Sequence, residues 1–274
     1  MHQYLPSPPA STVHFAFLTV HFYALTILFG IVVALVVGSF RYKSLGGDPN
    51  EISAIAVWTI PAGIIGGRLY HVITSPDRYF GAKGKPLDAL KIWQGGMGIW
   101  GAIALGTFAA YLAFKRVNRT QDFSVFADAL APGLLLAQAI GRWGNWFNNE
   151  LFGKPTQLPW ALKVPAEFRP LGFENFSTFQ PTFLYESLWC LFGALFIIFA
   201  LPKISVLRRL QRAPRPGSIF MGYVLYYCVG RLWIETLRID PAHTIGGFRV
   251  NIWVSLVGIC ASSIQLLRMN RACL

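Results

Sequence analysis

Residues 15–40 read FAFLTVHFYALTILFGIVVALVVGSF and contain no Asp, Glu, Lys or Arg. A helix needs about 20 mostly apolar residues to cross the hydrocarbon core of a bilayer, which is about 30 Å thick. The run satisfies that requirement and ends at Arg41 and Lys43. It predicts a membrane-spanning helix that is retained, because residues 1–12 lack the basic start of a cleaved signal peptide.

The composition of the whole chain agrees with this first segment. Of the 274 residues, 54% are hydrophobic and 13% are charged, whereas soluble domains carry roughly 25% charged residues. These values exclude an ordinary soluble domain and a disordered chain. We expect an all-α integral membrane protein with about seven transmembrane helices, in which residues 1–274 form a single polytopic domain. The six further apolar segments are residues 52–73, 97–114, 123–140, 183–201, 218–237 and 250–267.

The positions of the basic residues predict the orientation, because Lys and Arg concentrate in cytoplasmic loops. Twelve of the 24 lie on one set of alternating connections, and nine are spread over the other, longer set, which also carries six of the nine acidic residues of the connections. We therefore expect the N-terminus outside, the C-terminus in the cytoplasm, and a small extracytoplasmic head at about residues 148–180.

Six charged residues lie inside the expected spans or at their edges. A charge at a helix centre costs roughly 2.5–3.5 kcal/mol on insertion scales, so these residues should face one another or a wet cavity. They are either ion pairs that hold helices together or ligands for an anion, since Arg binds phosphate and carboxylate groups through its fork. The six are Arg68, Asp128, Arg142, Glu186, Arg231 and Glu235.

Residues 141–153, GRWGNWFNNELFG, are the most informative polar segment. If the fourth span continues through them as a helix, Gln138, Arg142, Asn145 and Asn149 share one face. A face with many donors and one cation suits a lipid phosphate and its polyol. The alternative is an amide and arginine network that caps a broken helix.

A second polar stripe runs along the sixth span, at a spacing of three or four residues. Tyr and Arg one helical turn apart can close on one anion, with a glutamate orienting the guanidinium. A purely structural Arg231–Glu235 pair is the competing interpretation. The stripe consists of Tyr223, Tyr227, Arg231, Glu235 and Arg238.

These segments resemble a known family. Residues 141–153 fit the signature G-R-x-G-N-[aromatic]-x-N-x-E-x-x-G of bacterial prolipoprotein diacylglyceryl transferases at every fixed position. The resemblance covers nearly the whole chain, because further family elements follow in order. They are Tyr23, Arg68, residues 93–97, residues 128–132, residues 181–186, and Tyr227-x-x-x-Arg231 with Glu235, Arg238 and residues 240–241.

The resemblance implies a membrane enzyme, a transferase, that acts in the bacterial cytoplasmic membrane at the first step of lipoprotein maturation. It would move an sn-1,2-diacylglyceryl group from phosphatidylglycerol to the lipobox cysteine thiol of a prolipoprotein. A thioether would form and glycerol 1-phosphate would leave. No cofactor, metal or nucleic acid partner is implied.

The matched residues can be given expected roles. Arg142 and Arg231 would clamp the phosphate, and Tyr23 and Tyr227 would hold it or donate to it, so these four are the catalytic candidates. The candidates for substrate binding are Arg68, Gln138, Arg142, Asn145, Asn148, Asn149, Glu150 and Gly153. The supporting candidates, which would orient the arginines, are Asp128, Glu186, Glu235 and Arg238.

The proton of the thiol has no clear acceptor in this sequence. The family commonly has a His-Gly-Gly element a few residues after Gly-Gly-Met, and here Trp100 stands at the histidine position. Trp cannot act as a general base. His71 is a possible base, and proton loss to the phosphate or to water is the alternative.

Two other functions fit the polar residues in the spans. A transporter or channel for an anionic substrate could line its pathway with them, although the sequence shows no repeated halves of the kind many transporters have. A lipid-binding scaffold without catalytic activity is the third interpretation.

Overall fold

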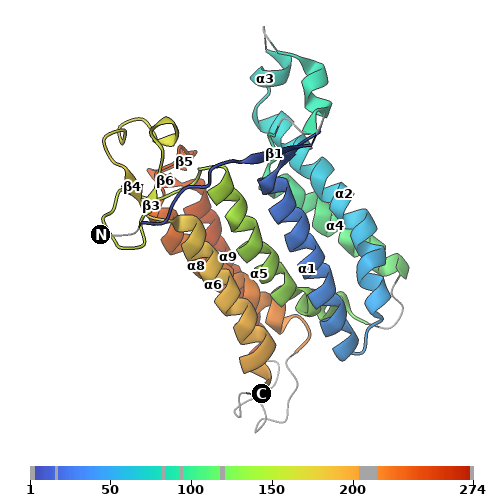
Figure 1. The fold of residues 1–274 in the computed structure, drawn as a ribbon. Coiled ribbons are helices and arrows are strands. Elements are labelled where there is room, and N and C mark those ends of the chain that lie inside the picture. Colours follow the sequence, from blue (N-terminus) through green and yellow to red (C-terminus); the bar gives the residue numbers. More distant parts are fainter. Residues whose placement is uncertain are drawn as a thin grey trace. The chain divides into compact units, whose positions relative to one another are not determined.

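The computed structural model describes residues 4–15, 18–81, 84–92, 95–117, 121–203 and 215–271. Long helices make up most of this part of the chain (Figure 1). They are α1 (Phe22–Ser44), α2 (Pro49–Thr74), α4 (Ile99–Val117), α5 (Phe123–Phe147), α6 (Thr182–Leu195), α8 (Ser218–Leu237) and α9 (Val250–Arg271). Short helical elements are α3 (Asp77–Phe80), η1 (Pro86–Leu90), η3 (Ala166–Phe168), η4 (Phe196–Ala200) and η5 (Leu201–Lys203).

Five of the described helices are long and apolar enough to cross a membrane. In the fourth of them, α6 continues through a π-helical turn, η4, and a 3-10 turn, η5. The predicted class, an all-α membrane protein, is confirmed to this extent. The five segments are Phe22–Ser44, Pro49–Thr74, Phe123–Phe147, Thr182–Lys203 and Val250–Met269.

The first helix begins later than the apolar run predicts. Strands β1 (Thr12–Phe15) and β2 (Leu18–His21) pair antiparallel, with Thr12 opposite His21 and Val13 opposite Val20. The β-branched residues of this stretch favour strands over helix. The prediction that the span starts at residue 15 is therefore wrong, because the helix starts only at Phe22.

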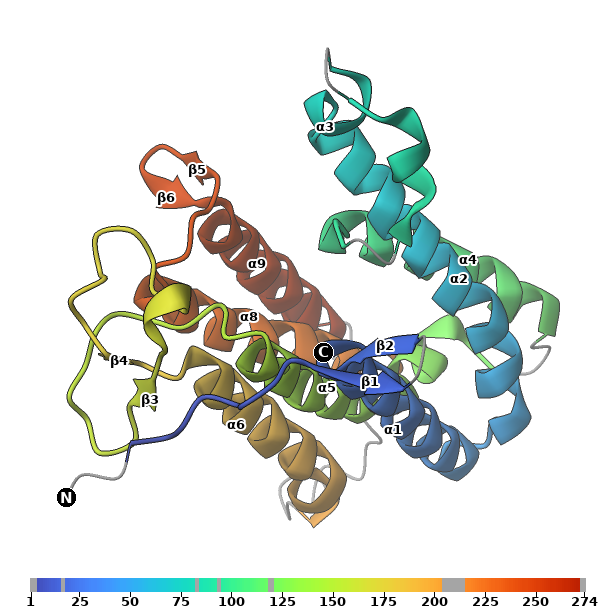
Figure 2. The same ribbon diagram turned by 45° about the horizontal axis from the view of Figure 1, so that its top comes forward.

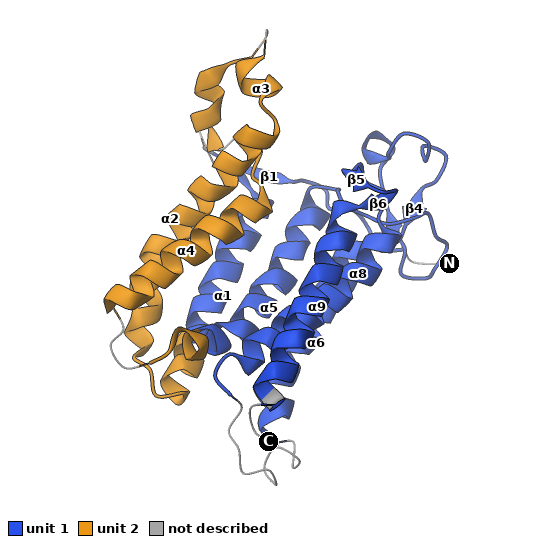
Figure 3. Ribbon diagram, turned by 180° about the vertical axis from the view of Figure 1, so that it is seen from behind, with its two compact units in different colours: residues 1–38, 127–274 blue, residues 39–126 orange. Residues whose placement is uncertain are grey.

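The chain forms two compact units, residues 39–126 and residues 1–38 with 127–274 (Figure 3). The smaller unit is built on α2 packed against α4. A Cβ on Gly66 would collide with the carbonyl oxygen of Gly101, and a Cβ on Gly101 with that of Gly66. The two helix backbones are thus in direct contact, as small residues allow between membrane helices.

The larger unit holds the first part of α1 together with α5, α6, α8 and α9. Helices α1 and α5 run antiparallel at close range. A Cβ on Gly30 would lie 3.0 Å from the Ala137 carbonyl oxygen, and one on Gly133 would lie 2.7 Å from that of Ala34. Leu135 of α5 belongs to a buried cluster with residues of α6 and α8.

Irregular segments gather at one end of the larger unit, where α5 and α8 end and α6 and α9 begin (Figure 2). They include the hairpins β3 (Leu162–Lys163) with β4 (Thr178–Phe179) and β5 (Thr244–Ile245) with β6 (Phe248–Arg249). The N-terminal segment joins the first of them, because the Leu5 amide donates to the Ala161 carbonyl at 2.9 Å. This end therefore carries its own small core, in which residues of the irregular segments pack against the start of α6.

Candidate active site

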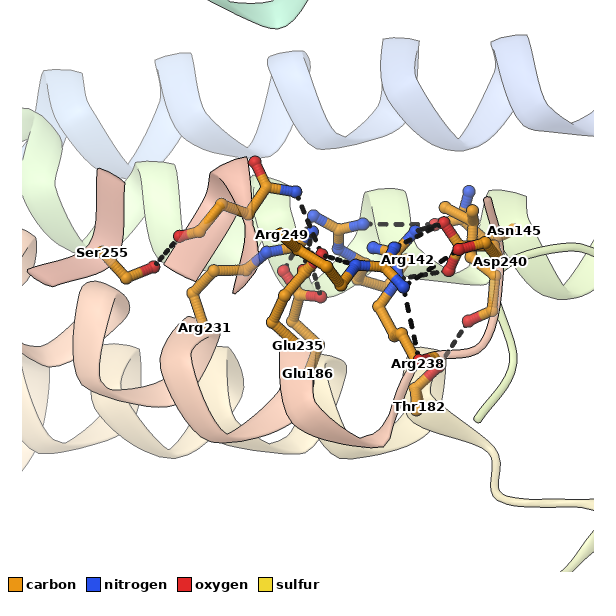
Figure 4. Close-up of polar contacts among 12 residues, drawn as sticks. Arg142, Asn145, Thr182, Glu186, Arg231, Glu235, Arg238, Asp240, Arg249 and Ser255 are labelled. Carbon is orange, nitrogen blue, oxygen red and sulfur yellow. Dashed lines mark hydrogen bonds and ion pairs between the residues drawn. The ribbon is translucent and has the colours of Figure 1, made fainter. Parts of the chain in front are cut away.

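A single carboxylate joins three helices of the larger unit. Glu186 of α6 binds Arg142 of α5, with 2.7 Å between Oε1 and Nη2, and Arg231 of α8, with 3.1 Å between Oε2 and Nη1. The Tyr227 hydroxyl of α8 also donates to Oε1, at 3.1 Å. The Glu186 side chain is only 4% exposed. The two arginines of the predicted clamp therefore meet on one buried anion (Figure 4).

Hydrogen bonds beside Glu186 hold α5 and α6 together. The Ser187 hydroxyl donates to the Ala139 carbonyl at 2.8 Å and accepts from Trp143 Nε1 at 3.2 Å. At the start of α6, the Thr182 hydroxyl donates to the Leu151 carbonyl. These contacts fix the register of the two helices, so that the arginine of one faces the glutamate of the other.

A second carboxylate, Glu235, lies one turn along α8 from Arg231. Its Oε2 is 2.5 Å from Arg231 Nη2, and its Oε1 is 2.6 Å from Arg249 Nε. The Asn251 amide of α9 donates to the same Oε1 at 3.3 Å. The Glu235 side chain is fully buried, as a charge with two cationic partners can be.

A third carboxylate, Asp240, follows the end of α8. Arg238 binds it through a two-pronged contact, Nε to Oδ1 at 2.7 Å and Nη2 to Oδ2 at 2.9 Å. Arg249 Nη2 reaches Oδ2 at 2.8 Å. Burial by itself raises the pKa of the Asp240 carboxyl, but the hydrogen bonds and charges of Arg238 and Arg249 outweigh it and hold that pKa below its usual value.

The amides of the signature segment converge on Glu150. Its Oε1 accepts from Asn145 Nδ2 at 2.9 Å and from Asn148 Nδ2 at 3.1 Å. Asn145 also accepts from Arg142 Nη1 at 3.4 Å. The amides and the clamp are therefore connected through the one face of α5 that carries both.

Asn149 does not share that face, and this part of the prediction is wrong. Helix α5 ends at Phe147, and Asn149 has a φ of 51°, followed by Leu151 with a φ of 58°. Asn is one of the few residues that tolerate this left-handed conformation. Asn149 Oδ1 is buried and finds no hydrogen-bond partner among the described residues.

Gly153 and Tyr23 lie at close contacts. A Cβ on Gly153 would be 3.0 Å from the Leu237 carbonyl oxygen at the end of α8, and the Gly153 amide donates to Gln180 at 2.8 Å. A Cβ on Gly144 would be 2.6 Å from Tyr23 Cδ2. The Gly153 contacts bring the chain to the end of α8 and to the segment before α6, and the Gly144 contact seats the Tyr23 ring on α5.

Asp128 and Gln138 contact other parts of α8. The Asp128 carboxylate accepts from the backbone amides of Gly217 and Phe220, both at 2.7 Å. It thus caps the positive end of α8. Gln138 Nε2 donates to the Tyr223 hydroxyl at 3.1 Å.

Arg68 belongs to the smaller unit and donates to backbone carbonyls there. Its Nε bonds to Ala89 at 2.8 Å, Nη1 to Gly95 at 2.5 Å and Gly96 at 3.0 Å, and Nη2 to Asp88 and, at 3.2 Å, to Lys91. A guanidinium has five N–H donors, and each of these bonds uses one. The predicted role of Arg68 in substrate binding stays a prediction.

The two residues linked to the proton question also lie in the smaller unit. His71 packs edge-on against Tyr79, with 6.0 Å between the ring centroids. Its Nε2 is buried without a hydrogen-bond partner among the described residues. Trp100 lies in the first turn of α4 and is 36% exposed.

The role of Arg249 in the site was not predicted from the sequence, where it is one of the nine basic residues of the longer connections. A local signal for its position exists, because Gly246 and Gly247 have φ values of 58° and 80° and form a two-residue turn. Gly-Gly between short apolar stretches indicates a β-hairpin. The hairpin returns the chain to α8 and delivers Arg249 to Glu235 and Asp240.

The comparison with protein families matches residues 10–268 to the prolipoprotein diacylglyceryl transferase family. The chain belongs to this family. The signature segment at residues 141–153 thus lies inside a match that spans both units.

Curated prolipoprotein diacylglyceryl transferases are similar over most of their length. Phosphatidylglycerol–prolipoprotein diacylglyceryl transferase 2 of Streptomyces coelicolor is 46% identical over 254 residues, 93% of this chain and 77% of the relative. The Frankia alni enzyme is 48% identical over 267 residues, 97% and 68% of the two chains. The Cutibacterium acnes enzyme is 46% identical over 267 residues, 97% and 87%.

Proposed function

We propose that this chain is a phosphatidylglycerol–prolipoprotein diacylglyceryl transferase. The observation that carries the proposal is the meeting of Arg142 and Arg231 on the single carboxylate of Glu186. Two guanidiniums that share one carboxylate keep positive charge and free donors for a further anion. The relatives bear the name of this activity, which favours it over an anion transporter or channel.

The reaction is a displacement at a carbon atom. The sulfur of a prolipoprotein lipobox cysteine forms a bond to the glyceryl CH2 of phosphatidylglycerol, while the bond from that carbon to the phosphate oxygen breaks. A thioether forms, the thiol proton is lost, and glycerol 1-phosphate leaves with the bonding electrons. The nucleophile is the thiolate, and an ordinary cysteine thiol has a pKa of about 8.5.

The arginines act on the leaving group. Negative charge grows on the phosphate oxygen as the carbon–oxygen bond breaks, and fixed cations aimed at it stabilise the transition state more than the bound substrate. Arg142 and Arg231 supply these cations from two helices. Glu186 and Glu235 orient them, Arg238 extends the same group, and Asp128 holds α8, which carries Arg231.

The neutral groups of the site bind the rest of the headgroup. Tyr23 and Tyr227 hold the phosphate or donate to it. Tyr227 lies one turn from Arg231 on α8 and bonds to Glu186, and Tyr23 packs on Gly144 of α5, the helix that carries Arg142. The glyceryl hydroxyls are bound by the polar groups of the signature segment and its helix. These are Gln138, Asn145, Asn148, Asn149, Glu150 and Gly153.

The thiol proton goes either to a base of the protein or to the phosphate or water. His71 is the candidate base, while the phosphate or water is the alternative, since Trp100 occupies the family's histidine position. Replacing His71 by Ala separates the two routes: turnover is lost in the first and kept in the second.

Both substrates reach the protein through the membrane. We place seven spans in the bacterial cytoplasmic membrane by adding α4 and α8 to the five apolar segments. The basic ends of α1, α4 and α9 are placed in the cytoplasm by the positive-inside rule. The N-terminus and the head at residues 148–180 then lie outside, where a prolipoprotein presents its cysteine.

Purified protein with labelled phosphatidylglycerol and a lipobox peptide in detergent tests the proposal. We expect label on the peptide thiol, and a loss of about 10²–10³-fold with Arg142→Lys, which keeps the charge but not the fork. Arg169→Lys is the matched control, since Arg169 donates to the backbone carbonyls of Val164 and Glu174 in the head. Unlabelled peptide with the wild type, or near-normal transfer with Arg142→Lys, would overturn the proposal.

A further inference from the structure

Seven charged side chains of the larger unit form one alternating series, which we call the ion-pair chain (Figure 4). Each carboxylate lies between two guanidiniums, and both ends of the series are arginines. In order, the ion-pair chain is Arg142, Glu186, Arg231, Glu235, Arg249, Asp240 and Arg238.

Arg249 is the one member of the ion-pair chain that lies outside the signature, the polar stripe and the other family elements named above. It binds Glu235 through Nε at 2.6 Å and Asp240 through Nη2 at 2.8 Å. Its Nη1 donates to the carbonyls of Asp240 at 2.9 Å and Arg238 at 3.3 Å. These contacts occupy its fork, so Arg249 is not placed to grip a substrate phosphate itself.

The charge count shows what Arg249 contributes. The ion-pair chain holds four guanidiniums and three carboxylates, an excess of one positive charge. The nearby Glu150 is bound by the amides of Asn145 and Asn148 and is the same in every variant considered below. Without Arg249 the count becomes three against three, and Glu235 keeps one guanidinium partner, Arg231, beside the neutral amide of Asn251.

We propose that Arg249 is a positioning residue. By sharing the carboxylate of Glu235 with Arg231, it leaves part of the positive charge of Arg231 available to the substrate phosphate. This inference rests on the proposed function, because it assigns a phosphate to the clamp. A fully buried carboxylate that has one guanidinium partner neutralises the charge of that guanidinium. A carboxylate shared by two guanidiniums leaves the positive charge of each partly uncompensated. Arg249 thereby sets the affinity of the site for anions.

The charge of the ligand separates this role from a structural one. Phosphatidylglycerol carries a phosphodiester with one negative charge, whereas the product glycerol 1-phosphate carries nearly two at pH 8, since a phosphomonoester has its second pKa near 6. Loss of one positive charge weakens the binding of the second anion about twice as much in free energy as that of the first. A local packing defect has no such dependence on ligand charge.

The test compares Arg249→Met with the double variant Arg249→Met/Glu235→Gln, which restores an excess of one positive charge and removes the carboxylate that Arg231 would otherwise neutralise. For Arg249→Met we expect KM for phosphatidylglycerol to rise about fivefold and Ki for glycerol 1-phosphate about 25-fold. In the double variant both values should return to within about twofold of the wild type. Arg169→Met, which removes an arginine bound to carbonyls in the head, is the control and should change neither.

Equal shifts of KM and Ki in Arg249→Met, or a double variant no better than the single one, would overturn the inference. If Arg249→Met does not fold, Asp240→Asn alone carries the test: its Ki for glycerol 1-phosphate should fall, and an unchanged or raised value overturns the inference. A wild type without transfer activity would instead defeat the proposed function, so the two failures are distinguishable.

Discussion

Arg68 and Arg231 are both arginines placed in apolar helices, but their guanidiniums are bound in opposite ways. Arg68 gives all five donors to neutral backbone carbonyls of residues 88–96. Arg231 gives its donors to two carboxylates, each of which it shares with another arginine. The first arrangement saturates the hydrogen bonds of the cation, and the second divides the available negative charge among several cations.

This difference separates an arginine that holds a loop from one that can bind a ligand. The guanidinium of Arg68 has all its donors on the carbonyls of residues 88, 89, 91, 95 and 96, so its predicted role in substrate binding would require it to give up some of these bonds. An arginine in the ion-pair chain can exchange a shared carboxylate for a substrate phosphate without leaving any carboxylate unpaired. The predictions below test this contrast.

The largest effect is expected on catalysis. Arg231→Lys should lower transfer per folded molecule about 10³-fold, because the fork to the phosphate is lost. Arg68→Lys should leave the same quantity within about threefold of the wild type. Initial rates normalised to the folded fraction measure both. Equal losses in the two variants would place Arg68 in the substrate site and break the contrast.

The next effect is on stability, and here the larger loss is expected for Arg68 and not for Arg231. Arg68→Met removes the guanidinium donors of five carbonyls, of which the Asp88 carbonyl still accepts from the Lys91 amide at 3.1 Å, and should lower the free energy of unfolding by about 3 kcal/mol. Thermal unfolding in detergent measures the loss, and limited proteolysis should show new cleavage near residues 88–96. An unchanged melting temperature would reject the structural role. Arg169→Met serves as the control for loss of an arginine as such.

A smaller effect is expected at the far end of α8. Asp128→Ala removes the acceptor for the amides of Gly217 and Phe220 and should lower the free energy of unfolding by about 1–2 kcal/mol. Transfer per folded molecule should change little, since the amides of Gly217 and Phe220 that Asp128 binds lie at the start of α8, more than ten residues before Arg231. If transfer fell as far as in Arg231→Lys, Asp128 would have to act on the substrate.

The smallest effect is a pH dependence at Asp240. Its pKa is lower in the folded protein than in the unfolded chain, so its contribution to stability is present above about pH 4 and is lost as pH falls through the folded pKa. We expect the wild type to exceed Asp240→Asn by less than about 1 kcal/mol at pH 6, because the pair is partly exposed. The two melting curves should converge once pH falls below the folded pKa of Asp240. A difference that persists there would assign the effect to packing.

Much of the fold could be predicted because the apolar runs of the sequence are long and the helices follow them. The segment 218–237 coincides with α8, and 52–73 lies within α2 (Pro49–Thr74). The start of the first span could not be predicted by hydropathy, since an apolar hairpin and an apolar helix have the same composition. The end of α5 before Asn149 depends on a left-handed turn that helical periodicity does not reveal.

In the candidate site, too, some contacts could be predicted from the sequence and others could not. It could be predicted that Arg142 and Arg231 meet charged partners, because a membrane helix rarely carries an uncompensated charge. The five carbonyl partners of Arg68 are backbone groups, so no side chain in the sequence points to them. Arg249 was missed because a charge in a connection was read only as a mark of orientation, while its partners Glu235 and Asp240 are reached through the turn of a hairpin.

A structure of the protein with bound phosphatidylglycerol tests the central claim most directly. We expect the lipid phosphate to accept hydrogen bonds from both Arg142 and Arg231, while Arg249 stays on Glu235 and Asp240 and Arg68 keeps its five carbonyls. A phosphate bound elsewhere, with Arg142 and Arg231 still joined only to Glu186 and Glu235, would contradict the account.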